Sequence, residues 1–434
     1  MAGYVLATQY WLLGSAGPLL AVMAIGLGAL WLPWGWAVHR LLSGQPTTRG
    51  TLAAVLILPS VWVAAEAARS WERLGGPWAL LGASQWNQPA TLASASIGGV
   101  WLTSFLIVAV NIAIVGAITM RSARMVAIGV AVALAAVGPA WFWFGPSPAS
   151  APTVTVALVQ PGDIEDAAAR LAAGEAITET LAGRGVDLIM WGESSVGVDL
   201  SSHPEALKRL VDLSRRAGAD VLVNVDARSP DGGIYKSSML IGPDGPRGAY
   251  AKTRLVPFGE YVPLRPLFGW AARHTKAAAE DRRRGDGPVV LHSGSLAIGP
   301  LISFETTFSD LARREVQLGA ELLAYQSSTS SFQGSWAQPQ LAGMVAVHAA
   351  EVGHPAVHAG LSGVSSAFDG RGRKLGWFPA RDRGVLVVEV PLASQITVYQ
   401  RLGDWVLGLA FSVAVGAGAV AALRAWCARS ARRS

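Results

Sequence analysis

The sequence is poor in cysteine and in charge. Its 434 residues include one cysteine, Cys427, which excludes a disulfide framework and a cysteine-based zinc site. Charged residues make up 15% of the chain, compared with about 25% in an ordinary soluble domain, whereas 51% of the residues are hydrophobic. This composition excludes a disordered chain and argues against a purely soluble protein.

The sequence contains five long runs of apolar residues. Four of them fall in the first third of the chain and one near its end, and each is about long enough to cross the hydrocarbon core of a bilayer. They cover residues 18–38, 51–68, 92–119, 125–144 and 405–426. The 17 tryptophans point the same way, because tryptophan favours membrane–water interfaces. The sequence therefore predicts a multi-pass membrane protein.

Arginines between and after these runs predict the orientation. If the spans alternate, the arginines lie on one side, which is then cytoplasmic. They are Arg40, Arg49, Arg121, Arg124, Arg424, Arg429, Arg432 and Arg433. Because a bilayer explains the formal charge of +6, we expect no nucleic-acid partner. Residues 145–404 and the N-terminus then lie on the extracytoplasmic side. Since residues 1–17 lack a signal-peptide pattern, we expect an upstream portion of the protein to be missing from this sequence.

These patterns predict the domain organisation. Residues 1–147 hold about four spans and the end of a further helix, residues 152–394 form an extracytoplasmic domain, residues 403–426 form the last span, and residues 427–434 form a basic cytoplasmic tail. Within 152–394, β-branched runs alternate with helix-like stretches, which predicts a layered α/β domain with catalytic residues at strand ends. Glu193 and Ser303 follow predicted strands, and Lys252 opens a polar loop. Taken singly, such a Glu or Ser is more often a helix cap.

Together these residues match a known pattern. Tyr250 to Pro263, read as Y-x-K-x-x-L-V-P-F-G-E-Y-V-P, resembles a signature of the nitrilase, or carbon–nitrogen hydrolase, superfamily. The match is closer to its membrane-embedded branch, the apolipoprotein N-acyltransferases. Further similar blocks are W-G-E at 191–193, G-G-P-W at 75–78, G-A-S-Q at 82–85 and A-A-E-V-G-H-P at 349–355. The resemblance extends from about residue 10 to residue 425.

The resemblance implies a multi-span α-helical membrane domain joined to an αββα nitrilase-like sandwich, in a bacterial cytoplasmic membrane. It implies transfer of an acyl chain from a phospholipid donor to a diacylglyceryl lipoprotein acceptor, by a monomer that uses no cofactor. Glu193 would be the base, Lys252 the oxyanion or base-polarising group, and residue 303 the nucleophile. The supporting residues would be Glu260, Glu305 and Phe304, and Trp78 would line the lipid pocket.

The nucleophile departs from the family pattern. The C-Y-E motif reads Ser303-Phe304-Glu305 here, and the N-D-A-W-F stretch reads S-T-S-S-F at 328–332. A serine hydroxyl is far less acidic than a thiol, and serine enzymes normally rely on a histidine. Three explanations stay open: an unusual working nucleophile, an inactive lipid- or lipoprotein-binding paralogue, or an engineered change. A membrane-tethered amidase is a further alternative. Cys427, on the cytoplasmic side, cannot replace the missing thiol.

Three other features have two interpretations each. The apolar loop at 264–270, with Leu267, Phe268 and Trp270, either dips into the outer leaflet to admit lipid or packs as an ordinary loop. The arginines at 282–284 are interpreted as a solvated charge run rather than a headgroup contact. The histidines at 348, 354 and 358 have helical-looking spacings, but no carboxylate or thiol cluster accompanies them, so we expect no metal site.

Overall fold

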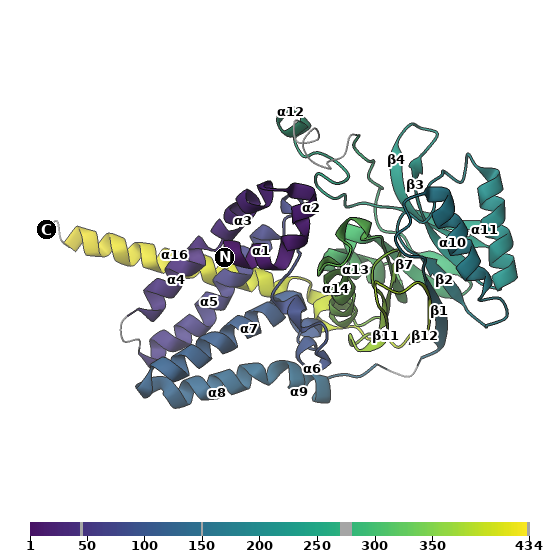
Figure 1. Ribbon diagram of the computed structural model, residues 1–434. Coiled ribbons are helices and arrows are strands. Elements are labelled where there is room, and N and C mark those ends of the chain that lie inside the picture. The colour runs from purple at the N-terminus through teal and green to yellow at the C-terminus, as the bar shows by residue number, and fades with distance from the viewer. Residues whose placement is uncertain (44–46, 149–150, 270–279, 432–434) are drawn as a thin grey trace.

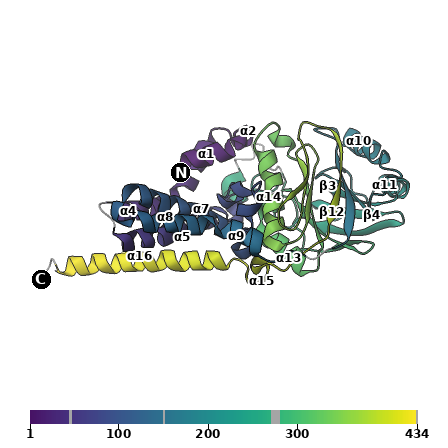
Figure 2. The ribbon, with the colours of Figure 1, turned by 90° about the horizontal axis from the view of Figure 1, so that it is seen from below.

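The computed structural model describes residues 1–43, 47–148, 151–269 and 280–431. A helical part lies beside an α/β part, and the C-terminal helix α16 (Trp405–Ala431) runs back from the α/β part along the helical part (Figures 1 and 2). The C-terminal end of α16 therefore lies on the side of the helical part that faces away from the sheets (Figure 1).

All five apolar runs form helices, as predicted. Three single helices are long and apolar enough to cross a membrane: α5 (Thr48–Arg69), α7 (Ala95–Thr119) and α16. The other two runs are bent pairs: α3 (Leu19–Ala29) with α4 (Leu32–Leu42), bent by 44°, and α8 (Arg124–Ala135) with α9 (Val137–Phe144), bent by 41°. Pro33 and Pro139 stand in the first turn of the second helix of each pair, and a proline has no backbone N–H to continue the preceding helix. The described residues thus hold three spans, or up to five if each bent pair is one span.

Helix α7 is broken near its start, at Gly98 and Gly99. Gly99 has a φ of +69°, a left-handed backbone that glycine adopts without steric cost. The amide of Val100, which opens the longer half, donates to the Glu351 Oε1 of the α/β part over 2.7 Å. A carboxylate from the other part of the molecule therefore caps this membrane helix.

The α/β part contains two six-stranded sheets. The first has the order β12-β1-β2-β3-β4-β5 and the second β11-β10-β9-β8-β7-β6. The first sheet comprises β12 (Gly384–Pro391), β1 (Thr153–Gln160), β2 (Leu188–Trp191), β3 (Asp220–Arg228), β4 (Ile234–Gly242) and β5 (Gly245–Ala251). The second comprises β11 (Lys374–Phe378), β10 (Ser365–Phe368), β9 (Ala356–Gly360), β8 (Leu322–Ser327), β7 (Leu296–Ile302) and β6 (Leu291–Ser293). In each sheet the central strands are parallel and the outer pairs antiparallel.

The two sheets pack face to face with helices outside. Their inner faces meet in a cluster of fully buried aliphatic side chains that includes Leu158, Met190, Ile298 and Leu322. Helices α10 (Ala167–Glu179) and α11 (Pro204–Ala217) cover the first sheet, and α13 (Ser309–Gln317) and α14 (Ala337–Val352) cover the second (Figures 1 and 2). This αββα sandwich beside membrane-length helices confirms the predicted fold class.

Short elements connect these units. They are α1 (Ala2–Gln9), η1 (Tyr10–Leu12), α2 (Leu13–Ala16), η2 (Glu72–Leu74), η3 (Gly82–Gln85), α6 (Pro89–Leu92), η4 (Arg121–Ala123), α12 (Arg265–Phe268), η6 (Ser303–Thr307), η7 (Ser330–Phe332) and α15 (Val398–Leu402). The loop at 75–85 and the turn η6 meet where the two parts of the molecule join, since Gly76 lies against Phe304.

Candidate active site

Three strand ends bring Glu193, Lys252 and Ser303 together. Glu193 follows β2, Lys252 follows β5, and Ser303 follows β7 of the facing sheet. The Lys252 Nζ lies 3.6 Å from the Glu193 Oε1, and the Ser303 side chain contributes to the lowered pKa of the Glu193 carboxyl group. The structure therefore brings Lys252 and Ser303 together at Glu193.

Two further charges complete a square of alternating sign around Glu193. The Lys252 Nζ donates to the Glu260 Oε1 over 2.9 Å. A second lysine, Lys236 of β4, donates to the Glu193 Oε1 over 2.7 Å and lies 3.6 Å from the Glu260 Oε1. Each ammonium thus faces both carboxylates. All four side chains are largely removed from water, and paired charges of this kind offset the cost of burial that an unpaired one would carry.

The electrostatics of the square keep Glu193 ionised. Burial alone raises the pKa of a carboxyl group, but the positive charges of Lys236 and Lys252 outweigh it. With the hydrogen bonds from Lys236 and Ser303 they lower the pKa of Glu193 from 4.5 to about 2. The same contacts raise the pKa of Lys236, against its burial, because Glu193, Asp226 and Glu260 surround it. Glu193 can therefore accept a proton at neutral pH.

The turn that presents Ser303 is sharp. Ser303 has a φ of +53°, in the left-handed region that costs a non-glycine residue free energy, and it is half-buried between β7 and η6. Ser194 and Thr329, beside the site, also have φ values of +58° and +57°. A nucleophile on a strained strand-to-helix turn is exposed at the end of its sheet.

Glu305 fixes this turn. Its fully buried carboxylate accepts a hydrogen bond from the Ile302 amide over 2.9 Å at one oxygen. The other oxygen accepts from the Tyr250 hydroxyl, the Thr253 hydroxyl and amide, and the Arg254 amide, at 2.7 to 3.0 Å. Glu305 therefore ties the Ser303 turn to the segment that carries Lys252, and its role is positional.

Phe304 anchors the turn to the helical part. Its ring packs edge-on against Phe308, with ring centroids 5.0 Å apart. Gly76 of the 75–85 loop lies against both rings: a Cβ at Gly76 would come within 2.8 Å of Phe304 and 2.9 Å of Phe308, and its φ is +74°. Only glycine fits this contact.

Trp78 belongs to an aromatic cluster next to the site. Trp11 of η1 lies 4.9 Å from Trp78 and 4.7 Å from Phe332, measured between ring centroids. Phe332 belongs to the loop whose Ser328 amide donates to the Glu193 Oε2 over 3.1 Å. The buried Arg69 of α5 donates to the Trp78 carbonyl oxygen and so holds this loop from the membrane side.

A buried hydrogen-bond network, formed by Glu351 and His348 of α14, links α7 to the Ser303 turn. Glu351, which caps α7, contacts the His348 Nδ1 over 2.7 Å through its second oxygen. The His348 Nε2 lies 2.8 Å from the Thr306 carbonyl oxygen in η6. Both side chains are fully buried. His348 thus holds the Ser303 turn. The described residues hold no group of three or more His, Cys, Asp or Glu side chains arranged for a metal.

The predicted lipid loop is only partly defined. Leu267 of α12 is 68% exposed, α12 ends at Phe268, and Trp270 lies outside the described residues. In Figure 1, α12 projects away from the sheets. Of the predicted charge run at 282–284, Arg283 and Arg284 are exposed, and Arg284 pairs with Glu72 at 2.6 Å, whereas Arg282 is half-buried and pairs with Asp226 at 3.0 Å.

Lys236, Asp226 and the Ser328 amide also contact the site, and none of them was predicted from the sequence. Lys236 is the one charged residue in β4, a possible signal in an otherwise uncharged strand. Its significance depends on the β4–β5 pairing, in which the Lys252 amide donates to the Lys236 carbonyl oxygen over 2.8 Å. The two lysines are neighbours for this reason, although 16 positions apart in the chain.

Comparison with known proteins places this arrangement in a class. Residues 155–400 match the family described as Carbon-nitrogen hydrolase, and residues 1–113 match the Apolipoprotein N-acyltransferase N-terminal domain. Fold and site together therefore define a membrane-bound member of the carbon–nitrogen hydrolase superfamily. The chain is 30% identical over 408 residues to an apolipoprotein N-acyltransferase of Geobacter metallireducens, covering 89% of this chain and 77% of that protein. It belongs to the apolipoprotein N-acyltransferase family.

A second relative and two solved structures are also similar to this chain. An apolipoprotein N-acyltransferase of Pseudomonas syringae pv. tomato is 30% identical over 407 residues, covering 90% of this chain and 78% of the relative. A solved amidase of the nitrilase superfamily from Nesterenkonia AN1 overlays with a TM-score of 0.44 and 18% identity, covering 60% of this chain and 94% of that one. A solved CN-hydrolase superfamily protein from Xanthomonas campestris overlays with a TM-score of 0.44 and 17% identity, covering 59% and 97%.

Proposed function

We propose that this chain transfers an acyl chain from a membrane phospholipid to the N-terminal amine of a diacylglyceryl-cysteine lipoprotein, through an acyl-enzyme on Ser303. The observation that carries the proposal is the buried, ionised Glu193 carboxylate between the Ser303 hydroxyl and the Lys252 ammonium. Acyl transfer needs a nucleophile, a base and a positive charge beside the developing oxyanion, and this site has all three.

The first half-reaction forms an ester. The Ser303 Oγ attacks the ester carbonyl carbon of the phospholipid, and its proton passes to Glu193. Lys252 stabilises the negative charge on the carbonyl oxygen in the tetrahedral intermediate. The bond between that carbon and the glycerol oxygen then breaks, and Glu193 returns the proton to this oxygen. A lysophospholipid leaves, and the acyl chain stays on Ser303.

The second half-reaction forms an amide. The α-amino group of the lipoprotein cysteine attacks the Ser303 ester, and Glu193 takes a proton from the amine. The Ser303 Oγ leaves and receives that proton, which restores the starting site. An oxygen ester acylates an amine less readily than a thioester does, so we expect slow turnover compared with a cysteine at the same position.

The remaining residues have supporting roles in this proposal. Glu260 holds Lys252, Glu305 and Phe304 hold the turn, and Trp78 forms part of the lipid wall with Trp11 and Phe332. The exposed Leu267, with Phe268 and Trp270, would enter the outer leaflet and admit lipid, rather than pack as an ordinary loop.

We further propose a multi-pass monomer of the bacterial cytoplasmic membrane whose nitrilase-like domain, residues 152–394, lies on the extracytoplasmic side. The arginine-bearing links after α4 and α7 and the end of α16 would be cytoplasmic. Arg69 follows the second span, on the opposite side from these arginines, and so departs from this charge pattern. It is 1% exposed and bonded to Trp78, so it acts as an internal contact rather than as a loop charge.

A second candidate function is a non-catalytic lipid- or lipoprotein-binding protein that assists an active enzyme. Serine at position 303 favours it, because a lone carboxylate is a weak base for a hydroxyl. A membrane-tethered amidase is the third candidate, and the membrane-length helices and the Trp11–Trp78–Phe332 cluster suit a lipid substrate better.

Mass spectrometry of a lipoprotein N-terminus separates the first two candidates. Cells lacking this gene would carry wild type, Ser303→Ala, Ser303→Cys, or Ser309→Ala as a matched control at the start of α13. We expect N-acylated lipoprotein with wild type, Ser303→Cys and Ser309→Ala, and a free amine with Ser303→Ala. If N-acylation appears only with Ser303→Cys, the natural site is inactive. If Ser303→Ala supports N-acylation as well as wild type, acyl transfer through this residue is refuted.

A further inference from the structure

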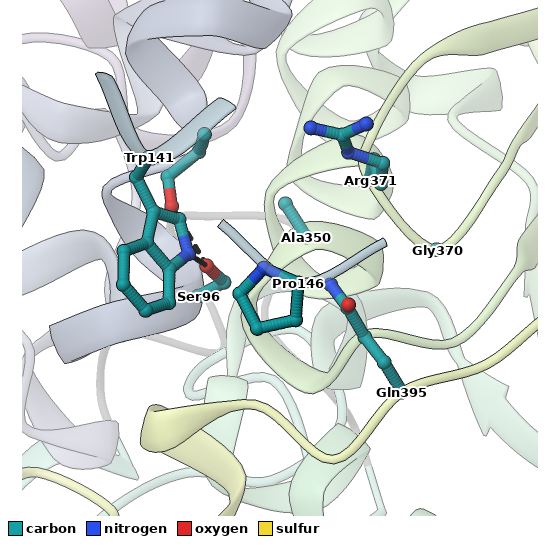
Figure 3. A pocket seen from close by; sticks show the side chains of 8 residues that line it. Ser96, Trp141, Pro146, Ala350, Gly370, Arg371 and Gln395 are labelled. Carbon is teal, nitrogen blue, oxygen red and sulfur yellow. Dashed lines mark hydrogen bonds between the residues drawn. The ribbon is translucent and has the colours of Figure 1, made fainter. Parts of the chain in front are cut away.

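A cavity of about 180 Å³ lies where the end of α9 meets the segment that leads from the sheets to α15. Its wall is formed by Trp141 of α9, Pro146, and residues 395–398 with Arg401, and a smaller recess beside it reaches Arg371 (Figure 3). Glu193, Lys252 and Ser303 do not line this cavity. It is therefore a second location, separate from the proposed acyl-transfer site.

One side of the cavity is apolar and includes the indole ring of Trp141. The Trp141 Nε1 donates to the Ser96 Oγ over 2.8 Å, which fixes the indole across the opening (Figure 3). Ile396, in the segment that leads to α15, also lines the cavity and is 67% exposed. Next to Trp141, the rings of Trp143 and Phe144 are 74% and 89% exposed at the end of α9. Exposed aromatic side chains at the end of an apolar helix mark the membrane–water interface.

The other side of the cavity is positively charged. Arg401 is exposed and Arg371 half-buried, and within the described part of the chain neither guanidinium lies within 4.0 Å of a carboxylate oxygen. Arg371 donates to the Phe142 carbonyl oxygen and lies over its ring, at 4.2 Å from the centroid. The nearby Asp369 is paired with Arg373. The lining thus offers cationic donors and no acidic side chain.

One polar atom in the lining has no partner. Among the described residues, the Gln395 Oε1 is buried and accepts no hydrogen bond. A buried acceptor of this kind costs free energy unless a donor reaches it. The lining therefore suits a ligand with two features: a negative charge that pairs with the guanidinium groups and a hydrogen-bond donor that reaches the Gln395 Oε1.

We propose that this cavity binds the headgroup of a resident membrane phospholipid, which is not the substrate. The phosphodiester contacts Arg401 and Arg371, a headgroup ammonium or hydroxyl donates to Gln395, and the acyl chains lie along the apolar side formed by α9. Guanidinium groups bind phosphate well. The apolar wall and the exposed rings at the end of α9 favour a lipid over free phosphate. The bound lipid then bridges the last bent span and the segment leading to α16.

Native mass spectrometry of the purified full chain in detergent tests this site directly. The protein would be titrated with dioleoyl phosphatidylglycerol or dioleoyl phosphatidylethanolamine, and separately with glycerol 3-phosphate and inorganic phosphate. We expect wild type to retain one lipid that Arg401→Gln retains at least fivefold more weakly. Arg401 is exposed, so Arg401→Gln is expected to fold. Arg371→Gln also loses the contact with Phe142, so its melting temperature would be compared with that of wild type before its lipid binding is measured.

Two control variants separate this site from others. Arg381→Gln removes an arginine whose side chain is 88% exposed elsewhere on the surface, and it should retain the lipid as wild type does. Ser303→Ala should also retain it, because the site does not depend on the proposed acyl transfer. Equal lipid retention by Arg401→Gln and wild type overturns the proposal, as does loss of the lipid in Ser303→Ala. Binding of inorganic phosphate as tightly as lipid overturns the choice of a lipid ligand.

Discussion

Replacing Lys236 with methionine removes the ammonium nearest to Glu193 while keeping a side chain of similar length. The lysine pair lowers the pKa of Glu193 from 4.5 to about 2 against its burial. That difference corresponds to about 3 kcal/mol between the two protonation states. The Lys236 Nζ lies 2.7 Å from the Glu193 Oε1 and the Lys252 Nζ lies 3.6 Å from it, so Lys236 carries the larger share. We therefore expect Lys236→Met to raise the pKa of Glu193 by about two pH units.

The assay is the release of lysophospholipid from a fluorescent phosphatidylethanolamine in detergent micelles, followed between about pH 3.5 and pH 8. Glu193 must be ionised to accept the Ser303 proton. Wild type should therefore lose no activity through Glu193 in this range, whereas Lys236→Met should lose activity below about pH 5. The matched control is Lys208→Met, which removes an exposed lysine paired with Asp212 on α11. If the acid limb of Lys236→Met coincides with that of wild type and Lys208→Met, Lys236 does not set the charge of Glu193.

Three further predictions concern stability and lipid binding. Glu305→Gln places an amide NH2 among donors such as the Tyr250 hydroxyl and the Ile302 amide; we expect a loss of about 3 kcal/mol, measured as a lower melting temperature, and an unchanged melting temperature would contradict the positional role. Burial lowers the pKa of His358 from 6.5 to about 4, so its contribution to the free energy of unfolding is complete above pH 6.5 and falls by about 3 kcal/mol as the pH drops to 4. His358→Gln should make the melting temperature less dependent on pH in this range. An equal pH dependence in the variant and wild type would refute the assignment of this effect to His358. Trp78→Ala should raise KM for the lipid donor about tenfold with little change in kcat, and a change confined to kcat would argue against a lipid wall.

The membrane helices were predictable because their signal is local. A run of about 20 apolar residues specifies a membrane helix without reference to the rest of the chain. The bends were missed: Pro33 and Pro139 lie inside runs whose hydropathy does not change there. Strands β5, β10 and β11 were also missed. In β5 two glycines and a proline weaken the strand pattern. Pairing with β4 stabilises this strand although its own residues have low strand propensity.

The candidate site was predictable only in part. Glu193, Lys252 and Ser303 follow strands and stand in motifs, and both signals can be read along the chain. Lys236 and the partners of residues 282–284 could not be found this way. Arg284 pairs with Glu72, and these two residues come from different parts of the fold, so no local pattern relates them. Long-range ion pairs depend on the completed packing of sheets and helices.

The central claim is that Ser303 carries the acyl chain. The most direct measurement is peptide mass spectrometry of the purified protein after incubation with a phospholipid whose acyl chain is isotopically labelled, quenched before any lipoprotein amine is added. The account predicts a labelled ester on the peptide containing Ser303, its loss when a diacylglyceryl-cysteine peptide is added, and its absence in Ser303→Ala. A peptide that stays unlabelled at Ser303, while Ser303→Cys becomes labelled under the same conditions, would contradict the claim.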